Sequence, residues 1–276
     1  MSKVVIGSSD PNPLVCGKGT AILRQHGIEV VEGVLKDACD RLNQVFFHFI
    51  RTGTPFVVMK YAMTMDGKIA TVSGKSRWIT GEAARVRVHA DRRRYSAILV
   101  GVGTVLADDP QLTCRMENGR NPLRIICDTH LRTPLSAKVV QTAAETPTLI
   151  ATACPDEGKQ DAFRQCGCQV LSLPEKDGHV ELRALMSALG NLNIDSVLLE
   201  GGSTLNWSTL ESGVVQKVQC YVAPKLFGGS GAKSPIGGLG VAEPGNAFRL
   251  RHTTVTQIGE DFLLESEVET GCLPEL

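Results

Sequence analysis

The sequence predicts an α/β protein with a mostly parallel sheet, helices on both faces and an antiparallel pair at the C-terminal edge. From residue 56 onward, short apolar runs alternate with helical stretches, which is the order of repeated strand–helix–strand units. The stretch 249–269 instead alternates apolar and polar residues around Gly259-Glu260-Asp261, as an antiparallel hairpin does. Gly is plentiful at 28 residues whereas aromatic residues make up only 5%, a balance typical of alternating helices and strands.

The first fifty or so residues form a separate small segment. The elements expected here are a strand at Val4–Ile6, a turn at Gly7–Pro13, a helix at Gly19–His26, an extended run at Ile28–Val31 and a helix at Leu35–Ile50. A segment of about fifty residues buries too little surface to fold alone easily. We therefore expect one end of a domain whose beginning is missing, followed by the linker Thr52-Gly53-Thr54-Pro55.

The remaining chain supplies the main sheet. The strands expected are Phe56–Tyr61, Ala97–Val102, Leu123–Asp128, Thr148–Thr152, Gln169–Leu173, Ser196–Leu199, Val218–Val222, Leu250–Ile258 and Phe262–Val268. The helices expected are Glu82–Arg94, Asp161–Gln165, Glu181–Leu189 and Thr204–Ser212. Thr80 is placed to cap the first of these helices, and Glu82 lies in its first turn.

Charge and composition argue against two classes of partner. Lys+Arg and Asp+Glu both number 29, so the net charge is zero, whereas a nucleic-acid-binding surface needs a basic excess. The longest apolar run, Ala97–Ala107, is about half as long as a membrane-spanning helix, so no membrane partner is expected. Nine scattered cysteines and an N-terminus without a secretory signal predict a cytoplasmic protein with reduced thiols.

The segment Glu200–Leu205 is the first candidate site, because ligands of open α/β sheets bind beyond the carboxyl ends of strands. Gly201 and Gly202 let a phosphate approach the backbone, and amides at the start of a helix attract it. The alternative is a plain strand-to-helix turn in which a Ser or Thr caps the helix. We favour phosphate or dinucleotide binding, because a carboxylate ending an apolar strand is costly without a partner.

Two other segments carry partial motifs. Gly101–Pro110 begins like the dinucleotide fingerprint, but Leu106 stands in place of its third glycine, so a glycine-rich turn explains it equally well. Ser73–Gly81 contains the Gly-Lys-Ser of a phosphate-binding P-loop, but Ile69 takes the place of its first glycine. Trp78, within that stretch, could pack on a cofactor or anchor the core.

Three more features have both a functional and a structural interpretation. Arg92-Arg93-Arg94 either places favourable charge at a helix C-terminus or clamps an anionic substrate. Gly228–Gly240 is either a mobile lid or an ordinary surface loop. His89-Ala90-Asp91 is similar to the His-x-Glu element of zinc deaminases, but the chain lacks the Pro-Cys-x-x-Cys ligands, so no metal site is expected.

Several segments together resemble the RibD family of riboflavin biosynthesis, whose members are bifunctional pyrimidine deaminases and reductases. In the family's order, they are Lys60–Ala70 (KYAMTMDGKIA), Ser73–Thr80 (SGKSRWIT), Gly101–Pro110 (GVGTVLADDP), Leu198–Leu205 (LLEGGSTL) and Ala223–Gly229 (APKLFGG). Near the N-terminus, Asp10–Gly19 (DPNPLVCGKG) and Ile28–Leu35 (IEVVEGVL) resemble the end of the family's deaminase domain. Each motif alone is weak, but their order across roughly residues 55 to 270 makes the resemblance specific.

The resemblance implies two domains and one remaining activity. Residues 1–52 would be the C-terminal remnant of a cytidine-deaminase-like domain, and residues 53–276 an NADPH-dependent reductase domain with a dihydrofolate-reductase-like fold. Because the family's zinc ligands lie upstream of the DPNP stretch, deaminase activity is expected to be absent. The expected reaction reduces the ribosyl group of 5-amino-6-(5-phosphoribosylamino)uracil to the ribitylamino product, and a homodimer or higher homo-oligomer is expected.

The resemblance also implies the residues that contact each ligand. The implied substrate contacts are Ser76, Arg92, Leu112, Arg115 and Glu200. The implied cofactor contacts are Ala62, Trp78, Thr104, Asp108, Thr129, Gly202, Ser203, Thr204, Leu205, Asn206, Trp207 and Ser208. Catalytic roles are implied for Glu200 and Lys60, and Asp66 is a further motif position with a catalytic or orienting role. Arg92 and Arg115 suit a ribose phosphate, because arginine binds phosphate through charge-assisted hydrogen bonds.

Two other functions stay open at this point. One is a dihydrofolate-reductase-like enzyme acting on another pterin or pyrimidine; a substrate without the phosphate would leave Arg92 and Arg115 without a purpose. The other is a non-catalytic NADP-binding module. Titration with the cofactor followed by an NADPH-oxidation assay separates all three.

Overall fold

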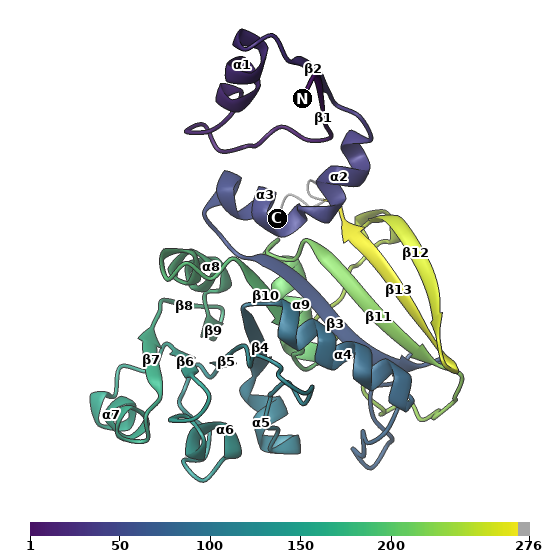
Figure 1. Ribbon diagram of the computed structural model, residues 1–276. Helices are drawn as coiled ribbons and strands as arrows, with labels where there is room; N and C mark the ends of the chain where they lie inside the picture. Colours follow the sequence, from purple (N-terminus) through teal and green to yellow (C-terminus); the bar gives the residue numbers. More distant parts are fainter. Residues whose placement is uncertain (270–276) are drawn as a thin grey trace. The chain divides into compact units, whose positions relative to one another are not determined.

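The computed structural model describes residues 1–269, which form two compact units (Figure 1). One unit comprises Met1–Phe56 together with Ser187–Asp195, and the other comprises Val57–Met186 together with the chain from Ser196 onward.

The first unit is small and leaves much apolar surface exposed. Its elements are β1 (Lys3–Ile6), α1 (Lys18–Gln25), β2 (Glu29–Glu32), α2 (Lys36–Leu42) and α3 (Gln44–Thr52). The two strands pair in parallel, with Lys3 opposite Glu29. The single helix predicted over Leu35–Ile50 is wrong: Asn43 ends α2 with φ −110° and ψ 19°, and its side-chain amide donates to the carbonyl of Cys39. Asn competes with the helix through such local hydrogen bonds, so the chain turns here.

The second unit contains a nine-stranded sheet. Its strands are β3 (Phe56–Thr64), β4 (Ala97–Gly101), β5 (Leu123–Cys127), β6 (Thr148–Thr152), β7 (Gln169–Ser172), β10 (Ser196–Leu199), β11 (Lys217–Ala223), β12 (Leu250–Ile258) and β13 (Asp261–Val268). The helices and the remaining short elements are α4 (Glu82–Arg94), α5 (Val102–Asp108), α6 (Lys138–Gln141), α7 (Glu157–Gln165), β8 (Glu175–Lys176), β9 (His179–Val180), α8 (Leu182–Asn191), α9 (Ser203–Glu211) and η1 (Pro244–Asn246). The boundary between the units falls within α8, whose residues from Ser187 onward belong to the first unit.

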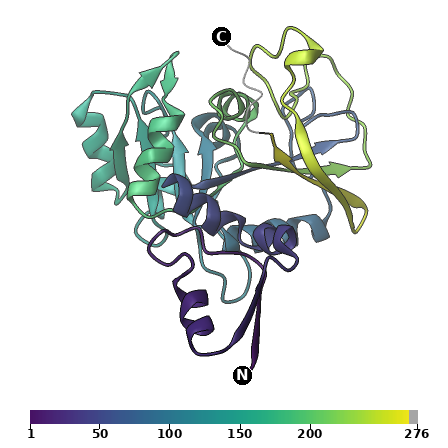
Figure 2. The same cartoon turned by 90° about the horizontal axis from the view of Figure 1, so that it is seen from above.

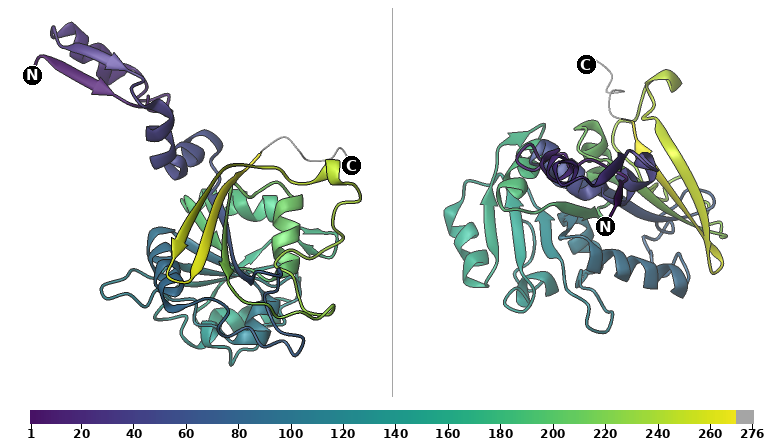
Figure 3. Two further views of the ribbon diagram at one scale, coloured as in Figure 1. Left: turned by 90° about the vertical axis from the view of Figure 1, so that its right-hand side faces the viewer. Right: turned by 45° about the horizontal axis from the view of Figure 1, so that its top comes forward.

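The strand order in this sheet is β12-β13-β11-β3-β10-β4-β5-β6-β7. The pairs β11·β3, β10·β4, β4·β5, β5·β6 and β6·β7 are parallel, whereas β12·β13 and β11·β13 are antiparallel. The antiparallel hairpin forms one edge of the sheet (Figure 3). The predicted fold class, a dihydrofolate-reductase-like mixed sheet with an antiparallel C-terminal edge, is therefore confirmed.

Helices α4 and α9 lie on opposite faces of the sheet (Figure 2). Ala84 of α4 is fully buried against Tyr221 and Leu263. Leu205 of α9 lies close to Gly101, where an added Cβ atom would meet its side chain at 3.7 Å. Helices thus cover both faces of the parallel part of the sheet. Because side chains on both faces of its strands are buried, each strand reads as a continuous apolar run in the sequence.

Two local predictions in this unit are wrong. Gly81, not Thr80, is the N-cap residue of α4, and its amide donates to the Asp261 carboxylate at 2.7 Å. An acceptor 180 positions away thus replaces the expected local cap. The strand predicted over Ala97–Val102 ends at Gly101, and α5 follows at once. Two glycines near its start made this helix resemble a turn.

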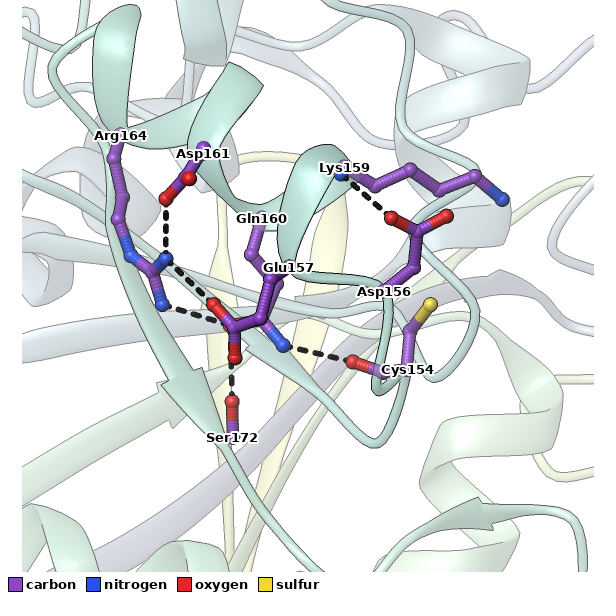
Figure 4. A network of polar contacts seen from close by, with 8 residues as sticks. All are labelled: Cys154, Asp156, Glu157, Lys159, Gln160, Asp161, Arg164 and Ser172. Atoms are coloured by element: carbon purple, nitrogen blue, oxygen red, sulfur yellow. Dashed lines mark hydrogen bonds and ion pairs between the residues drawn. The ribbon is translucent and has the colours of Figure 1, made fainter.

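Helix α7 begins earlier than predicted, at Glu157, because Asp156 caps it by accepting a hydrogen bond from the amide of Lys159 at 3.0 Å (Figure 4). The buried Gln160 joins this helix to its surroundings. Its Nε2 donates to the carbonyl of Cys154 at 2.8 Å, and its Oε1 accepts from the hydroxyl of Ser172 at 3.1 Å. These bonds attach α7 to β7 and to the loop that follows β6.

Candidate functional site

A cavity of about 480 Å³ opens at the carboxyl ends of β4, β5 and β10, where Gly101, Cys127 and Glu200 line it. Ten of the predicted site residues also line this cavity: Ser76, Thr104, Asp108, Thr129, Glu200, Gly202, Ser203, Thr204, Leu205 and Ser208. Residues from four separate stretches of sequence thus meet at one edge of the sheet, as the rule for open α/β sheets predicts.

The segments after β10 and β4 lie side by side because these strands are neighbours. A Cβ atom on Gly202 would lie 3.6 Å from the hydroxyl oxygen of Thr104, an ordinary van der Waals contact, so the two segments lie close together at this point. Gly202 is the N-cap residue of α9, and no side chain of residues 1–269 caps that helix. The first amides of α9 are therefore available to a phosphate group.

Glu200, which directly follows β10, is bound to Arg92 of α4. Arg92 donates from Nε to Oε1 and from Nη2 to Oε2, both at 2.8 Å, and from Nη1 to the carbonyl of Thr113 at 3.1 Å. The side chains of Arg92 and Glu200 are only 14% and 11% exposed. Burial alone would raise the pKa of Glu200, but Arg92 and Lys60 lower it to about 2. The carboxylate is thus ionised at neutral pH.

Lys60, on β3, lies in the same charged cluster. Its Nζ is 5.6 Å from the centre of the Tyr221 ring, and the Tyr221 hydroxyl donates to Asp91 at 3.5 Å. Burial lowers the pKa of Lys60, while the charge of Glu200 opposes that shift. The two residues predicted to be catalytic therefore lie close enough to influence each other's protonation.

The segment after α5 holds two predicted substrate contacts outside the cavity lining. Leu112 is buried with a positive φ of 54°. The amide of Arg115 donates to Nδ1 of His89 at 3.3 Å, whereas the Arg115 side chain is exposed and its Nη2 lies 3.5 Å from Oε1 of Gln111. The backbone at Arg115 is held in place, and its guanidinium remains available to an anion.

Ala62 and Trp78, two predicted cofactor contacts, do not line the cavity. Ala62 packs beside the buried Ala84 of α4. Trp78 is 60% exposed, and the guanidinium of Arg85 lies 4.6 Å above its ring.

Asn206 and Trp207 lie on a side of α9 that does not line the cavity. The buried Asn206 donates from Nδ2 to the carbonyl of Pro235 at 2.9 Å, and Trp207 makes an edge-to-face contact with Phe248. The amide of Gly237 donates to the carbonyl of Ser203 at 3.0 Å. These bonds attach the 228–240 segment to α9, and Gly231 and Lys233 of that segment form part of the cavity wall.

Asp66 joins the turn after β3 to the segment after β11. Its carboxylate accepts hydrogen bonds from the Thr64 hydroxyl at 2.5 Å and from the amides of Phe227 and Gly228 at 3.1 and 2.6 Å. The bond from Thr64, followed by that from Gly228, lowers the pKa of Asp66 to about 2. This geometry favours the orienting role over the catalytic one.

Three basic residues of the lining were not predicted: Arg132, His179 and Lys233. Arg132 follows β5 after five residues, so the general rule about strand ends contained a signal for it. His179 and Lys233 lie on a two-residue strand and in a glycine-rich loop, and neither stretch carried a recognisable pattern.

Within residues 1–269, no group of three or more His, Cys, Asp and Glu side chains is arranged to hold a metal ion. In the same range, no helix has the length and apolar character needed to cross a membrane.

Comparisons with known proteins agree on one family. Residues 55–264 match the model of the RibD C-terminal domain. The riboflavin biosynthesis protein RibD of Actinobacillus pleuropneumoniae is 57% identical over 265 residues, covering 96% of this chain and 70% of that protein. The 2,5-diamino-6-ribosylamino-4(3H)-pyrimidinone 5′-phosphate reductase of Methanothermobacter thermautotrophicus is 38% identical, covering 78% of this chain and 99% of that protein. A solved structure of Acinetobacter baumannii RibD aligns with a TM-score of 0.81 at 33% identity, covering 97% of this chain and 73% of that one.

Proposed function

Because the chain belongs to the RibD family through the reductase domain matched by residues 55–264, we propose that it transfers a hydride from NADPH to the ribosyl group of 5-amino-6-(5-phosphoribosylamino)uracil. The product is the corresponding ribitylamino compound. The observation that carries the proposal is one cavity in which an ionised, arginine-bound carboxylate, Glu200, adjoins the uncapped start of α9. The chain is thus an oxidoreductase of the riboflavin pathway.

The cavity fits a dinucleotide at its centre. Gly202 and Ser203 present amides and a hydroxyl at the start of α9, and Thr104 lies across from them. These groups would hold the negatively charged pyrophosphate, which a helix N-terminus favours. When bound, the nicotinamide supplies the hydride that goes to C1 of the ring-opened sugar. Ser76 and Asp108, whose side chains lie 3.4 Å apart, form part of the wall beside this position.

Glu200 and Lys60 supply the charges around the reacting carbon. The Glu200 carboxylate stabilises positive charge on the substrate imine, because it stays ionised and Arg92 fixes its orientation. Arginine has five N–H groups, of which Arg92 uses three for Glu200 and Thr113, so two remain for the substrate. Lys60 has a lowered pKa, which makes it suited to give a proton to the departing sugar oxygen.

Arg115 would bind the phosphate at the far end of the substrate. Its side chain is exposed, and the bond from its own amide to His89 holds its backbone. A fixed backbone with an exposed guanidinium, bonded only to Gln111 among the described residues, suits charge-assisted recognition of a phosphate.

The test is an NADPH-oxidation assay with the phosphorylated ribosylaminopyrimidine, beside the same compound without its phosphate. We expect turnover of the phosphorylated compound and a large loss of kcat/KM without the phosphate. Equal turnover of both compounds would favour a reductase of another pyrimidine or pterin. Tight cofactor binding without turnover of any such compound would favour a non-catalytic binding module.

We also propose that the chain self-associates as a homodimer or higher homo-oligomer. Strand β12 is an edge strand, and eight of its nine residues are exposed, including Val255 at 63%. An exposed edge strand presents unpaired amides and carbonyls to a second copy.

Two further parts of the proposal concern the N-terminal unit and the compartment. Residues 1–52 are proposed to be the end of a cytidine-deaminase-like domain, which agrees with the exposed Leu14, Leu35 and Leu42 of that small unit.

A cytoplasmic location is proposed because eight cysteines of residues 1–269 are free thiols, the state that a reducing compartment maintains.

A further inference from the structure

In the segment after β5, the acidic residue Asp128 is buried, whereas the basic residue Arg132 lines the cavity. Asp128 is fully buried, and its two carboxylate oxygens accept hydrogen bonds from the amides of Arg132 at 2.9 Å and Thr133 at 2.6 Å. The side chain of Arg132 lines the cavity and is exposed. No acceptor among residues 1–269 takes a hydrogen bond from its guanidinium. The loop therefore offers an unpartnered cation to any ligand in that part of the cavity.

The position of this loop identifies the part of a dinucleotide that would reach it. The start of α9 and Thr104 stand at the ends of the neighbouring strands β10 and β4, where the pyrophosphate would lie. On one side of this point is β3, beside Lys60 and the reacting groups. On the other side is β5, followed by Asp128–Thr133. The adenosine half of the cofactor would therefore extend over the end of β5.

Enzymes that select NADH place an acid after a strand to bind the ribose 2′-hydroxyl, whereas enzymes that select NADPH place an arginine near the 2′-phosphate. Here Asp128 is fully buried and both of its carboxylate oxygens are engaged by the backbone, so this acid neither binds a 2′-hydroxyl nor faces a 2′-phosphate. Arg132, whose amide makes one of those bonds, is the charged residue of this loop that lines the cavity.

We propose that Arg132 recognises the 2′-phosphate of NADPH and thereby determines the preference for NADPH over NADH. This inference rests on the proposed function, which supplies the cofactor, and adds the residue that selects it. Thr129 supports the arrangement: its hydroxyl accepts a hydrogen bond from the amide of Val180 at 3.2 Å and thus holds β9 against the loop. His179 of β9 is a second basic residue at the same end of the cavity, but it lacks the permanent charge of arginine.

The experiment measures dissociation constants by titration, without turnover, for NADPH, NADH, 2′,5′-ADP and 5′-AMP. In Arg132→Gln, we expect affinity for NADPH and 2′,5′-ADP to fall about tenfold to a hundredfold, the scale of one lost charge-assisted hydrogen bond. Affinity for NADH and 5′-AMP should stay near that of the parent. Unchanged thermal unfolding of the variant would show that the loop still folds.

Lys233→Gln is the matched control, because Lys233 also lines the cavity but lies in the 228–240 segment. This substitution should change the affinities for NADPH and NADH by the same factor. An Arg132→Gln variant that keeps the parent's NADPH preference, or a His179→Gln variant that alone loses it, would overturn the inference and leave the proposed function intact. A parent chain that binds neither NADPH nor 2′,5′-ADP would instead contradict the proposed function.

Discussion

Glu200 combines burial with a fixed charge, and this combination makes it the residue on which turnover should depend most. In Glu200→Gln, the shape is kept and the charge is lost. We expect kcat/KM to fall by roughly 10²-fold or more, the scale of losing one electrostatic stabiliser, while affinity for NADPH stays close to that of the parent. Glu211→Gln, an exposed change at the end of α9, serves as the control. Near-normal turnover in Glu200→Gln would show that the carboxylate only stabilises the fold.

The same carboxylate predicts how stability depends on pH. Its pKa is lowered from 4.5 to about 2 in the folded chain, so the stabilisation that comes from its ionised form is fully present at pH 4.5 and just above. That contribution is lost as the pH falls from 4.5 toward 2, because the carboxylate takes up a proton. We therefore expect the difference in unfolding free energy between the parent and Glu200→Gln to shrink as the pH falls from 4.5 toward 2. Chemical denaturation across this range measures the difference, and one that does not depend on pH contradicts the assignment.

Arg115 offers a cleaner test of phosphate recognition than Arg92. We expect Arg115→Ala to weaken substrate binding by roughly tenfold to a hundredfold, the result of losing about 1.5 to 3 kcal/mol from one charge-assisted contact, with little change for NADPH. Arg92→Ala should add a loss of turnover and of stability, because it leaves Glu200 buried without its partner. Binding of a dephosphorylated substrate analogue is the comparison. Equal losses for that analogue would mean that the phosphate is not the target of Arg115.

At the level of elements, the fully buried Arg124 joins β5 to the segments around it. Its guanidinium donates to the carbonyls of Gln111, Val139, Thr142 and Thr146 at 2.7 to 3.1 Å. Each buried acceptor left without a donor costs about 1 to 3 kcal/mol. We therefore expect Arg124→Met to lower the unfolding free energy by about 4 kcal/mol or more, an exceptionally large value for one substitution.

Urea denaturation checks this prediction, with Arg164→Met as the control. Arg164 lies on the surface of α7, where its ion pairs with Glu157 and Asp161 are exposed to water, so little change is expected (Figure 4). A loss for Arg124→Met no larger than that for Arg164→Met would show that water or a rearranged loop replaces the missing donors.

Element boundaries were predictable where local pattern determines them and failed where a distant group does. The spacing of apolar residues placed α4, β6, β10 and β12 at their observed bounds. The N-cap of α4 was wrong because the acceptor comes from Asp261 on another strand. The break at Asn43 was missed because a continuous apolar stripe masked a local hydrogen bond to Cys39.

For the whole molecule, the exposed edge strand β12 predicts self-association. We expect a molar mass of at least two chains in light scattering after size exclusion. Val255→Lys, which places a charge on the exposed edge, should shift the mass toward that of one chain without lowering the melting temperature. Glu211→Gln is the control, because Glu211 is exposed as Val255 is but does not lie on β12. Thr209→Val would suit less well, because Thr209 is buried. A parent that is monomeric at all concentrations would contradict the proposed oligomer.

The sequence by itself determined the order along the chain of the nine strands of the main sheet and of α4, α7, α8 and α9, the parallel sheet with its antiparallel edge, and the family to which the motifs belong. It did not predict α5 or α6. The predicted features follow from local information, because the periodicity of apolar residues and the glycines of a strand-to-helix turn act within a few positions of each other. The segment Glu200–Leu205 was a candidate on this local basis, whereas the other predicted site residues came from the family resemblance. Ten of the predicted residues line one cavity.

Only the tertiary structure decided which charged groups are paired and which remain free. Arg92 and Glu200 are 108 positions apart in the sequence. They meet because Glu200 directly follows β10, which lies between β3 and β4, and because α4, which carries Arg92, covers one face of the sheet (Figure 2). The same strand order places Arg132, which follows β5, in the lining of the cavity, while the carboxylate of Asp128 accepts hydrogen bonds from the amides of Arg132 and Thr133. Side chains that are distant along the chain acquire their partners only when the sheet assembles, so no local pattern could reveal these pairs.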